Sequence, residues 1–497
     1  MSPPLLRPVA SHRPKRRRAI WAATLGCALG AGALTGHAAP GTADGTPPAQ
    51  PQIAASVDEV RVAGHAMAPQ QAREVAAQAL ARGRNDIAIA IAEALIARDS
   101  EDTFGHFVLA QAFLRAGQAD KARAPARRAF ALAQTPTQKH EAARVAALTA
   151  ATQERFLPAQ IWMRRALQNA PTPEAEARAA NEFRTVRRAS KLRLRFALSV
   201  SPSNNVNGGA SEEVHVVEGL PFVGILSPDA LALSGTISRG RVSGGYVLHK
   251  TQTAVTEVVG DVQVQRVTLS ADARDKAPMA DAKNYGYTIA ELGLAHRRLT
   301  VQGGPVLSFG AHLGRAWFGG DHAYDTQRAQ LGLTQKIGDA TELHLGHGRQ
   351  IQIDADGTRD DVVNTSWSLA LSHKLGNADR LSAGLFLGET EGDNVQIGKT
   401  TRGLSLGYAR AKPVGPLELS ASLRAQESHY PDYHVIFPVP GGRWDTQLSA
   451  QIDIGLHQLD YMGFIPTLSV KRQKTSSNVG RFDTEATSIS IGFKSQF

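Results

Sequence analysis

The chain ends in a clear alternation of apolar and polar positions. From Ser488 onward, Ile489, Ile491, Phe493 and Phe497 share one parity, while serine, glycine, lysine and glutamine occupy the other. A period of two places successive side chains on opposite faces of a β-strand. About ten residues is also the length that a tilted strand needs to cross a bilayer. The pattern predicts a membrane-spanning strand, with an edge strand of a soluble sheet as the alternative.

The same alternation runs through most of the chain after residue 190. It begins at Lys191, where leucine, phenylalanine and valine alternate with lysine, arginine and serine up to Val200. An even number of antiparallel strands is typical of single-chain outer-membrane barrels. We predict fourteen strands, at residues 191–200, 236–250, 254–269, 285–297, 305–317, 323–336, 340–353, 362–375, 379–389, 397–410, 415–428, 444–456, 461–472 and 486–497.

The connections between these strands alternate in length. Those after odd strands are mostly long, and several after even strands are short, although the connection at 318–322 is shorter than this rule prefers. In outer-membrane barrels the long loops face outside and the short turns face the periplasm. The pattern predicts long connections at 201–235, 270–284, 354–361, 390–396, 429–443 and 473–485, and short ones at 337–339, 376–378, 411–414 and 457–460.

The second face of these strands is polar and carries charges. Charged side chains are costly against lipid and are accommodated in a water-filled barrel interior. The sequence therefore predicts a hydrated lumen, without indicating what passes through it. The residues that define this polar face are Arg193, Arg195, Glu342, Glu418, Arg424, Gln451 and Asp453.

Residues 68–190 have a different composition, rich in alanine, arginine, leucine and glutamine with helical spacing. Residues 80–83 (Leu-Ala-Arg-Gly) recur as 114–117 (Leu-Arg-Ala-Gly), an offset of 34 residues, and the third unit drifts by three. That period is typical of tetratricopeptide repeats, whose stacked helix pairs form a concave binding face. We predict helices at about 69–82, 86–98, 102–116, 119–133, 138–153, 158–169 and 173–188.

The N-terminus has the pattern of an export signal. A basic run at residues 13–18 precedes the uncharged segment Ala19–Leu34, and the small residues Gly36-His37-Ala38 follow. This order predicts a secretory signal peptide at residues 1–38, with an N-terminal membrane anchor as the alternative. Residues 39–67, rich in proline, alanine, glycine and threonine, are predicted to be a flexible linker.

Processing would remove much of the chain's charge and its single cysteine. Residues 1–40 hold six basic residues and no acidic ones, so the net charge would fall from +10 to about +4, which argues against a nucleic-acid partner. Cys27 lies inside the signal core, where a lipidation site is the alternative interpretation. The mature chain would then have no disulfide and no thiolate metal site.

Three local motifs resemble catalytic or metal sites, and each has a simpler structural interpretation. The segment 403–407 matches G-x-S-x-G, but it lies inside an alternating strand with no helix after it. His344 and His347 would fall on opposite faces of one strand. An acidic loop at residues 354–361 lacks the full spacing of a calcium loop. We predict no catalytic residues, no cofactor-binding residues and no metal site, and therefore no enzyme.

The layout of signal peptide, helical repeats and barrel resembles the surface lipoprotein assembly modifier (Slam) family of outer-membrane translocators. The segment 201–207 (Ser-Pro-Ser-Asn-Asn-Val-Asn) is similar to that family's barrel opening. Pro466, Ser477-Asn478 and Phe497 resemble its ending. The polar residues 494–496 depart from the more aromatic ending of the family and leave the barrel-assembly signal weaker.

The resemblance spans about residues 70–497 and implies a function. Members of the family help deliver surface lipoproteins or secreted haem- and iron-related proteins across the outer membrane. The implied partners are such a client, periplasmic chaperones, the barrel-assembly machinery and outer-membrane lipid. The barrel would lie in the bacterial outer membrane and the helical domain in the periplasm. Two alternatives remain, a polysaccharide exporter with a periplasmic repeat domain and a passive porin.

Overall fold

A computed structural model describes residues 59–62, 65–220, 223–394, 396–434, 437–456, 459 and 464–495 of this chain. The chain divides into two compact units, with the division between Ala189 and Ser190. The sequence analysis places the same boundary one residue later. The predicted signal peptide, most of the predicted linker and Phe497 lie outside the described residues.

The end of the predicted linker is ordered, which corrects that part of the sequence analysis. β1 (Val60–Val62) pairs with β2 (His65–Met67) as a two-stranded antiparallel sheet. Val60 is only 1% exposed and packs with the apolar core of the first helices. The prediction of a flexible segment up to residue 67 was wrong because two nearby valines, too few to form a visible pattern, join a core built by other residues.

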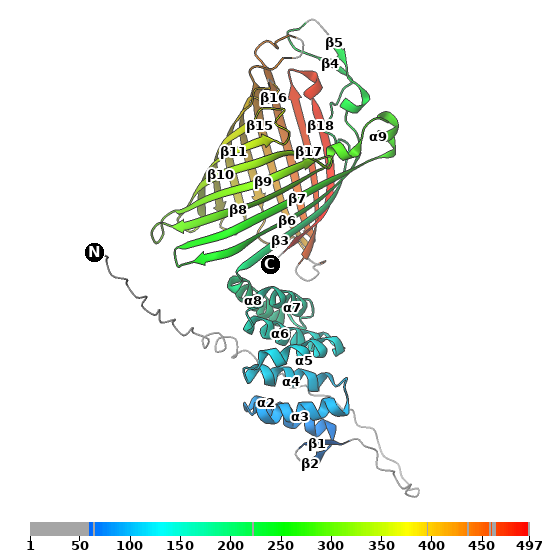
Figure 1. Cartoon of the computed structure of the whole chain (residues 1–497), viewed down its shortest axis with the longest axis vertical. Coiled ribbons are helices and arrows are strands. Elements are labelled where there is room, and N and C mark those ends of the chain that lie inside the picture. The colour runs from blue at the N-terminus through cyan, green and yellow to red at the C-terminus, as the bar shows by residue number, and fades with distance from the viewer. Residues whose placement is uncertain are drawn as a thin grey trace, which may run out of the picture. The chain divides into compact units, whose positions relative to one another are not determined.

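Seven helices follow within the described part of the first unit, and each packs against the next along the chain (Figure 1). Buried alanines such as Ala76, Ala92 and Ala126 allow close approach between neighbouring helices. None of the described helices is long and apolar enough to cross a membrane. The helices are α2 (Pro69–Ala81), α3 (Asn85–Arg98), α4 (Thr103–Arg115), α5 (Ala119–Leu132), α6 (Pro136–Thr152), α7 (Phe156–Gln168) and α8 (Pro173–Ala189).

The turns after α2, α4 and α6 share one backbone geometry. Gly83, Gly117 and Glu154 have φ values of 73°, 74° and 58°. In each turn the following residue donates its N–H to a carbonyl five positions earlier, for example Arg155 to Ala150 at 2.9 Å. This is the Schellman geometry, which requires a left-handed residue. The offset of 34 residues between the two glycines is therefore structural, and Glu154 is their counterpart in the drifting third unit.

Replacing Glu154 by glycine is expected to raise the free energy of unfolding of the helical unit by about 0.5–1 kcal/mol, because a side chain in this conformation is strained. The matched change Gly117→Ala is expected to lower it by about 1 kcal/mol, since a Cβ there meets no atom within 4 Å and only backbone strain is added. Urea unfolding followed by helical circular dichroism measures both. A Glu154→Gly variant less stable than the parent would contradict the repeat equivalence.

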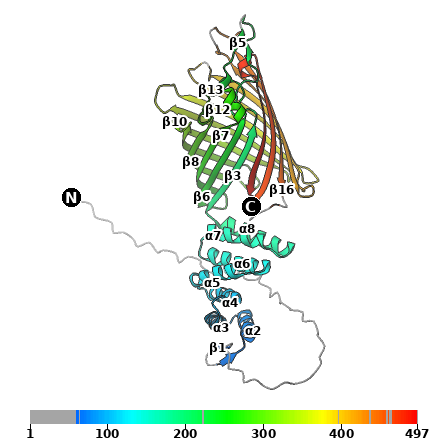
Figure 2. The ribbon, with the colours of Figure 1, turned by 90° about the vertical axis from the view of Figure 1, so that its right-hand side faces the viewer.

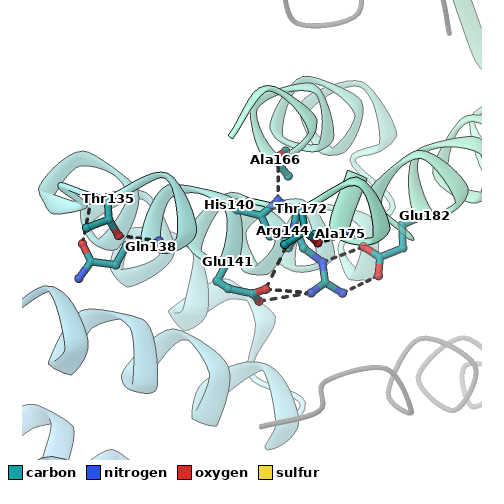
Figure 3. Close-up of polar contacts among 9 residues, drawn as sticks. All are labelled: Thr135, Gln138, His140, Glu141, Arg144, Ala166, Thr172, Ala175 and Glu182. Atoms are coloured by element: carbon teal, nitrogen blue, oxygen red, sulfur yellow. Dashed lines mark hydrogen bonds and ion pairs between the residues drawn. The ribbon is translucent and has the colours of Figure 1, made fainter. Parts of the chain in front are cut away.

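Helix α6 is tied to both of its successors by polar contacts (Figure 3). His140 is 2% exposed, and its Nδ1 lies 2.8 Å from the carbonyl oxygen of Ala166 in α7. Arg144 donates to both carboxylate oxygens of Glu182 in α8, at 2.5 and 3.1 Å, and also to Glu141 at 3.3 Å. Burial opposes the charge of Arg144, but the two carboxylates outweigh it and raise its pKa. These contacts hold α6, α7 and α8 against one another.

The second unit is a closed barrel of fourteen antiparallel strands, as predicted (Figures 1 and 2). Each strand pairs with its chain neighbour in the barrel, and β18 closes the barrel against β3. The strands are β3 (Leu192–Ser203), β6 (Gly235–Lys250), β7 (Ala254–Leu269), β8 (Tyr287–Leu299), β9 (Val306–Phe318), β10 (Asp321–Ile337), β11 (Thr341–Asp354), β12 (Val362–Lys374), β13 (Arg380–Glu391), β14 (Lys399–Ala409), β15 (Leu417–Tyr430), β16 (Arg443–Leu456), β17 (Phe464–Ser477) and β18 (Thr484–Ser495).

One end of the barrel carries the long connections. The 204–234 connection contains the small hairpin of β4 (Val214–Val216) and β5 (Val223–Ile225), and α9 (Ala271–Lys276) follows β7 at the same end (Figure 1). The exception expected near residues 318–322 is confirmed, because β9 and β10 are joined by a tight Gly319–Gly320 turn with positive φ at both residues. The predicted alternation holds for connections such as 270–286 against 251–253 and 355–361 against 338–340. It was wrong at 392–398 and 410–416, which are equally long, and at 478–483, which is short because β17 and β18 extend into the predicted loop.

The outer wall is an apolar band. Phe196 pairs with Val242, and Val242 pairs with Val262, so exposed apolar residues on neighbouring strands form rows around the wall. These three side chains are 41–50% exposed. A closed antiparallel barrel with such a band is the form in which β proteins cross bacterial outer membranes, because lipid offers no partners for unpaired backbone groups.

Candidate functional site

The inner face of the barrel wall is polar and reached by solvent. On β3, Leu194 and Phe196 face outward. Arg195 lies between them and Ala197 follows Phe196, so both side chains face the lumen, and both are exposed. The same holds for Ser382 on β13. An exposed alanine on the inner face means that side chains do not fill the lumen at this level. The polar face predicted from the sequence comprises Arg193, Arg195, Glu342, Glu418, Arg424, Gln451 and Asp453, all at lumen-facing positions.

An ion-pair network covers the lumen-facing side of β3, β6, β7 and β8. Glu257 of β7 is 6% exposed and pairs with both Arg193 of β3 and Arg297 of β8. The Arg193 pair spans the intervening strand β6, where Gly245 lies directly opposite Arg193. A Cβ at Gly245 would lie 3.1 Å from a carboxylate oxygen of Glu257. The missing side chain therefore gives the carboxylate room to cross that strand.

A second pair crosses a strand in the same way. Glu291 of β8 and Arg328 of β10 are 2.5 Å apart, on the two sides of β9. Gly314 of β9 lies opposite both Glu291 and Thr326, and a Cβ there would lie 2.8 Å from the Glu291 side chain. Both pairs join strands that share no backbone hydrogen bonds, so they fix the curvature of this part of the wall.

At the long-loop end, Arg443 packs against aromatic rings from the end of β15 and from two connections. Its guanidinium lies 3.6 Å from the ring centre of Tyr430 and 3.7 Å from that of Phe482, and it pairs with Asp445 at 3.2 Å. Arg443 is 5% exposed. Around it lies an apolar cluster from the connections 204–234, 431–442 and 478–483. We call it the loop cluster, and its buried members are Val217, Tyr430, Tyr433, Val439 and Val479.

At the short-turn end, Asp379 joins two neighbouring turns. Its carboxylate accepts from the Tyr408 hydroxyl at 2.5 Å, from the Ala411 N–H at 2.8 Å and from the Asn377 amide at 2.8 Å. These donors, with Tyr408 foremost, hold the pKa of Asp379 below its ordinary value. The ionised carboxylate therefore serves as an acceptor that closes the turns after β12 and β14.

The three motifs considered in the sequence analysis belong to barrel strands and a connecting loop and do not form catalytic or metal sites. Ser405 lies within β14, so the G-x-S-x-G segment does not form a strand-to-helix elbow. His344 contacts the Thr334 hydroxyl, whereas the His347 ring packs at a tilt against Trp367 on the opposite face of β11, with ring centres 3.9 Å apart. Asp354 accepts from backbone N–H groups of its own loop, at 3.0 Å from Thr358. Among the described residues, no group of three or more potential ligands is arranged to hold a metal.

Sequence reasoning missed the ion pairs that cross a strand and the loop cluster. A partial signal existed, because glycine inside an alternating strand often marks close approach by another group. However, Gly245 and Gly314 are two of many strand glycines, and the alternation pattern does not show which ones lie beneath a charged pair.

The chain was compared with protein-family models, curated proteins and solved structures. No family model and no curated protein matches. Among solved structures, OmpT, an outer-membrane protein of Vibrio cholerae, is similar at 10% identity and a TM-score of 0.32, covering 62% of this chain and 98% of that one.

Two further solved structures are also similar at low sequence identity and low TM-score. An outer membrane channel from Pseudomonas putida F1 has 9% identity and a TM-score of 0.33, covering 60% and 93% of the two chains. The type III secretion translocator chaperone SycD of Yersinia enterocolitica has 17% identity and a TM-score of 0.22, covering 24% and 82%. The barrel assignment rests on the strand pairing of this chain itself.

Proposed function

We propose that this protein is an outer-membrane translocator that assists delivery of client proteins, either surface lipoproteins or secreted haem- and iron-related proteins, to the cell surface. The observation that carries the proposal is the union, in one chain, of a stack of seven described helices with a barrel whose inner face is reached by solvent. A helical stack offers a binding surface for an extended segment, and a hydrated lumen offers a polar passage.

The helical unit has an exposed apolar site suited to a client. Leu157 and Ile161 lie four residues apart on α7, which places them on one face, and they are 41% and 44% exposed. An exposed i, i+4 pair of large apolar residues offers apolar contact area to a bound segment. We propose that this pair recruits the client, alone or with its periplasmic chaperone.

We place the helical unit in the periplasm. It joins the barrel through Ser190, just before β3, and β3 begins at the short-turn end, which in outer-membrane barrels faces the periplasm. Such barrels reach the membrane through the barrel-assembly machinery, which would be a further partner. Three of the acidic residues that face the lumen, Glu257, Asp261 and Glu291, are paired with arginines, which does not favour the polysaccharide exporter.

A passive channel is the second candidate function, and the solvent-exposed inner face favours it. Exposed Ser382 and Arg424 show that water reaches the wall from within. A steady ion conductance of the purified chain in planar bilayers, unaffected by removal of residues 68–189, would support this function. A closed barrel would count against it.

Surface display tests the translocator proposal. The full chain is expressed with an exported protein encoded beside its reading frame, and intact cells are treated with protease. We expect display to depend on this chain and to fail in the double variant Leu157→Asp, Ile161→Asp. The matched control is Val75→Asp on α2, which changes a residue of similar exposure, 37%, on another helix.

The control separates recruitment from folding. If Val75→Asp abolishes display as fully as the α7 variant, the α7 pair is not the recruiting surface. If display is independent of this chain while protease cleavage of its long loops shows an inserted barrel, the translocator proposal fails for that client and the channel becomes the better account.

A further inference from the structure

The acidic residues facing the lumen along β7 and β8 already have basic partners. Asp261 pairs with Arg241 at 2.7 Å, Glu291 pairs with Arg328, and Glu257 is shared by two arginines. These carboxylates are therefore neutralised by neighbours within the wall. They do not balance the charge of other basic residues on the inner face.

Several lumen-facing basic residues on other strands have no such partner among the described residues, and Arg239, Arg424 and Lys471 are three of them. Arg424 of β15 and Lys471 of β17 form no ion pair there, and Arg239 of β6 donates only to the amide oxygen of Gln265, at 2.9 Å. The strand register brings them near one another: the row through Arg424 reaches β17 two positions from Lys471, and the row through Arg239 reaches β17 four positions from Lys471. We call Arg239, Arg424 and Lys471 the luminal cation cluster.

The acidic residue nearest to the cluster by strand register is Asp453. It lies opposite Ser469, two positions from Lys471, and its Oδ1 accepts from Ser469 and from Gln451 at 2.5 and 2.8 Å. Among the described residues the wall therefore supplies no ion-pair partner to these three cations, an arrangement that a bound anion relieves.

A recess lined by Arg239 supplies further donors, and Ser469, two positions from Lys471 on β17, also lines it. It has a volume of about 350 Å³ and lies where β17 and β18 meet β3 and β6. Arg239 and Arg241 line it together with hydroxyl groups. Guanidinium and hydroxyl groups are the donors that bind phosphate and carboxylate oxygens. The lumen-facing hydroxyl residues of the recess are Ser199, Thr467, Ser469 and Ser490.

We propose that the luminal cation cluster and this recess form a binding site for a multivalent oxyanion, either a phosphorylated or a polycarboxylate compound. Arg239 and the hydroxyl groups hold its oxygens, and Lys471 and Arg424 neutralise its remaining charge. The site is independent of client delivery by the helical unit. It gives the barrel a ligand of its own, bound on the inner wall.

Titration calorimetry of the full chain in detergent micelles tests the site. Sodium pyrophosphate and sodium citrate are titrated separately at low ionic strength, because salt screens exposed charges. We expect saturable binding of at least one of them. Binding of pyrophosphate alone identifies a phosphate site, and binding of citrate alone identifies a polycarboxylate site. If neither binds, the proposal is overturned.

Two sets of variants locate the site. The triple change Arg239→Gln, Arg424→Gln, Lys471→Gln is expected to weaken binding at least tenfold, and Lys471→Gln alone several-fold should the triple variant fail to fold. The matched control, Arg298→Gln, Arg349→Gln, Lys474→Gln, removes the same charge from exposed positions on the outer side of the wall. Equal binding in both sets, or equal loss in both, places the anion elsewhere and overturns the proposal.

Discussion

Replacing Arg443 by methionine is expected to lower the free energy of unfolding of the barrel by about 3 kcal/mol. The change removes a buried guanidinium from between the rings of Tyr430 and Phe482 and leaves Asp445 without its basic partner. Asp445 is 14% exposed at its side chain, so water compensates only in part. Urea unfolding in lipid vesicles measures the loss.

The same variant is expected to loosen the long loops. The loop cluster joins the 204–234 connection to residues near Val479, through the pairing of Val217 with Val479. Limited proteolysis of the folded barrel should therefore cut the 204–234 connection faster in the variant. Arg481→Met is the matched control, because Arg481 lies 5.2 Å from the Phe482 ring but is exposed. Its effect is expected to stay within about 0.5 kcal/mol, and a control as damaging as Arg443→Met would refute the role of burial.

Adding a single methyl group at Gly314 is expected to cost about 2–3 kcal/mol of barrel stability. A Cβ at this position would lie 2.6 Å from the Thr326 hydroxyl, 2.8 Å from the Glu291 side chain and 2.9 Å from the Ala290 carbonyl oxygen. The carbonyl belongs to the neighbouring strand and has little freedom to move. The Gly314→Ala change therefore displaces either the strand or the Glu291 carboxylate, and urea unfolding in vesicles measures the cost.

Gly260→Ala is the matched control for Gly314→Ala. It adds the same methyl group to another barrel strand, where the nearest atoms would lie at 3.7 and 3.9 Å, an ordinary contact distance. We expect no loss of stability there. A double-mutant cycle then links the cost to the ion pair, because Gly314→Ala should cost less when Arg328 is already glutamine. Additive effects would show that the strand clash, and not the pair, dominates.

The sequence predicted the strands well because a barrel wall has one lipid face and one water face. Every strand then repeats the same alternation, and a shift by one residue would bury charge in lipid. The boundaries of β7 and β16 illustrate this, as they differ from the predicted ones by at most one residue. The helices were predictable for a related reason, since the turn at Gly83 recurs at Gly117.

The alternation of apolar and polar residues could not predict contacts between segments that are distant in the chain. The pairing of Arg193 with Glu257 depends on which strands are neighbours and on the absence of a side chain at Gly245, and neither changes the alternation. Likewise, nothing in the local sequence shows that Arg443 is buried among the rings of Tyr430, Tyr433 and Phe482. Such contacts are set by register and closure of the whole barrel.

The sequence by itself determined the architecture: a helical unit followed by a fourteen-stranded barrel with a polar inner face. Period and composition act locally, so each segment carries its own evidence. Only the tertiary structure decided which charges neutralise one another and which remain exposed in the lumen. Closure of β18 against β3 brings the strands of Arg239, Arg424 and Lys471 into one stretch of wall, although these residues lie far apart in the chain. The physical reason is that charge pairing depends on distances of a few ångströms across strands, which only the closed barrel defines.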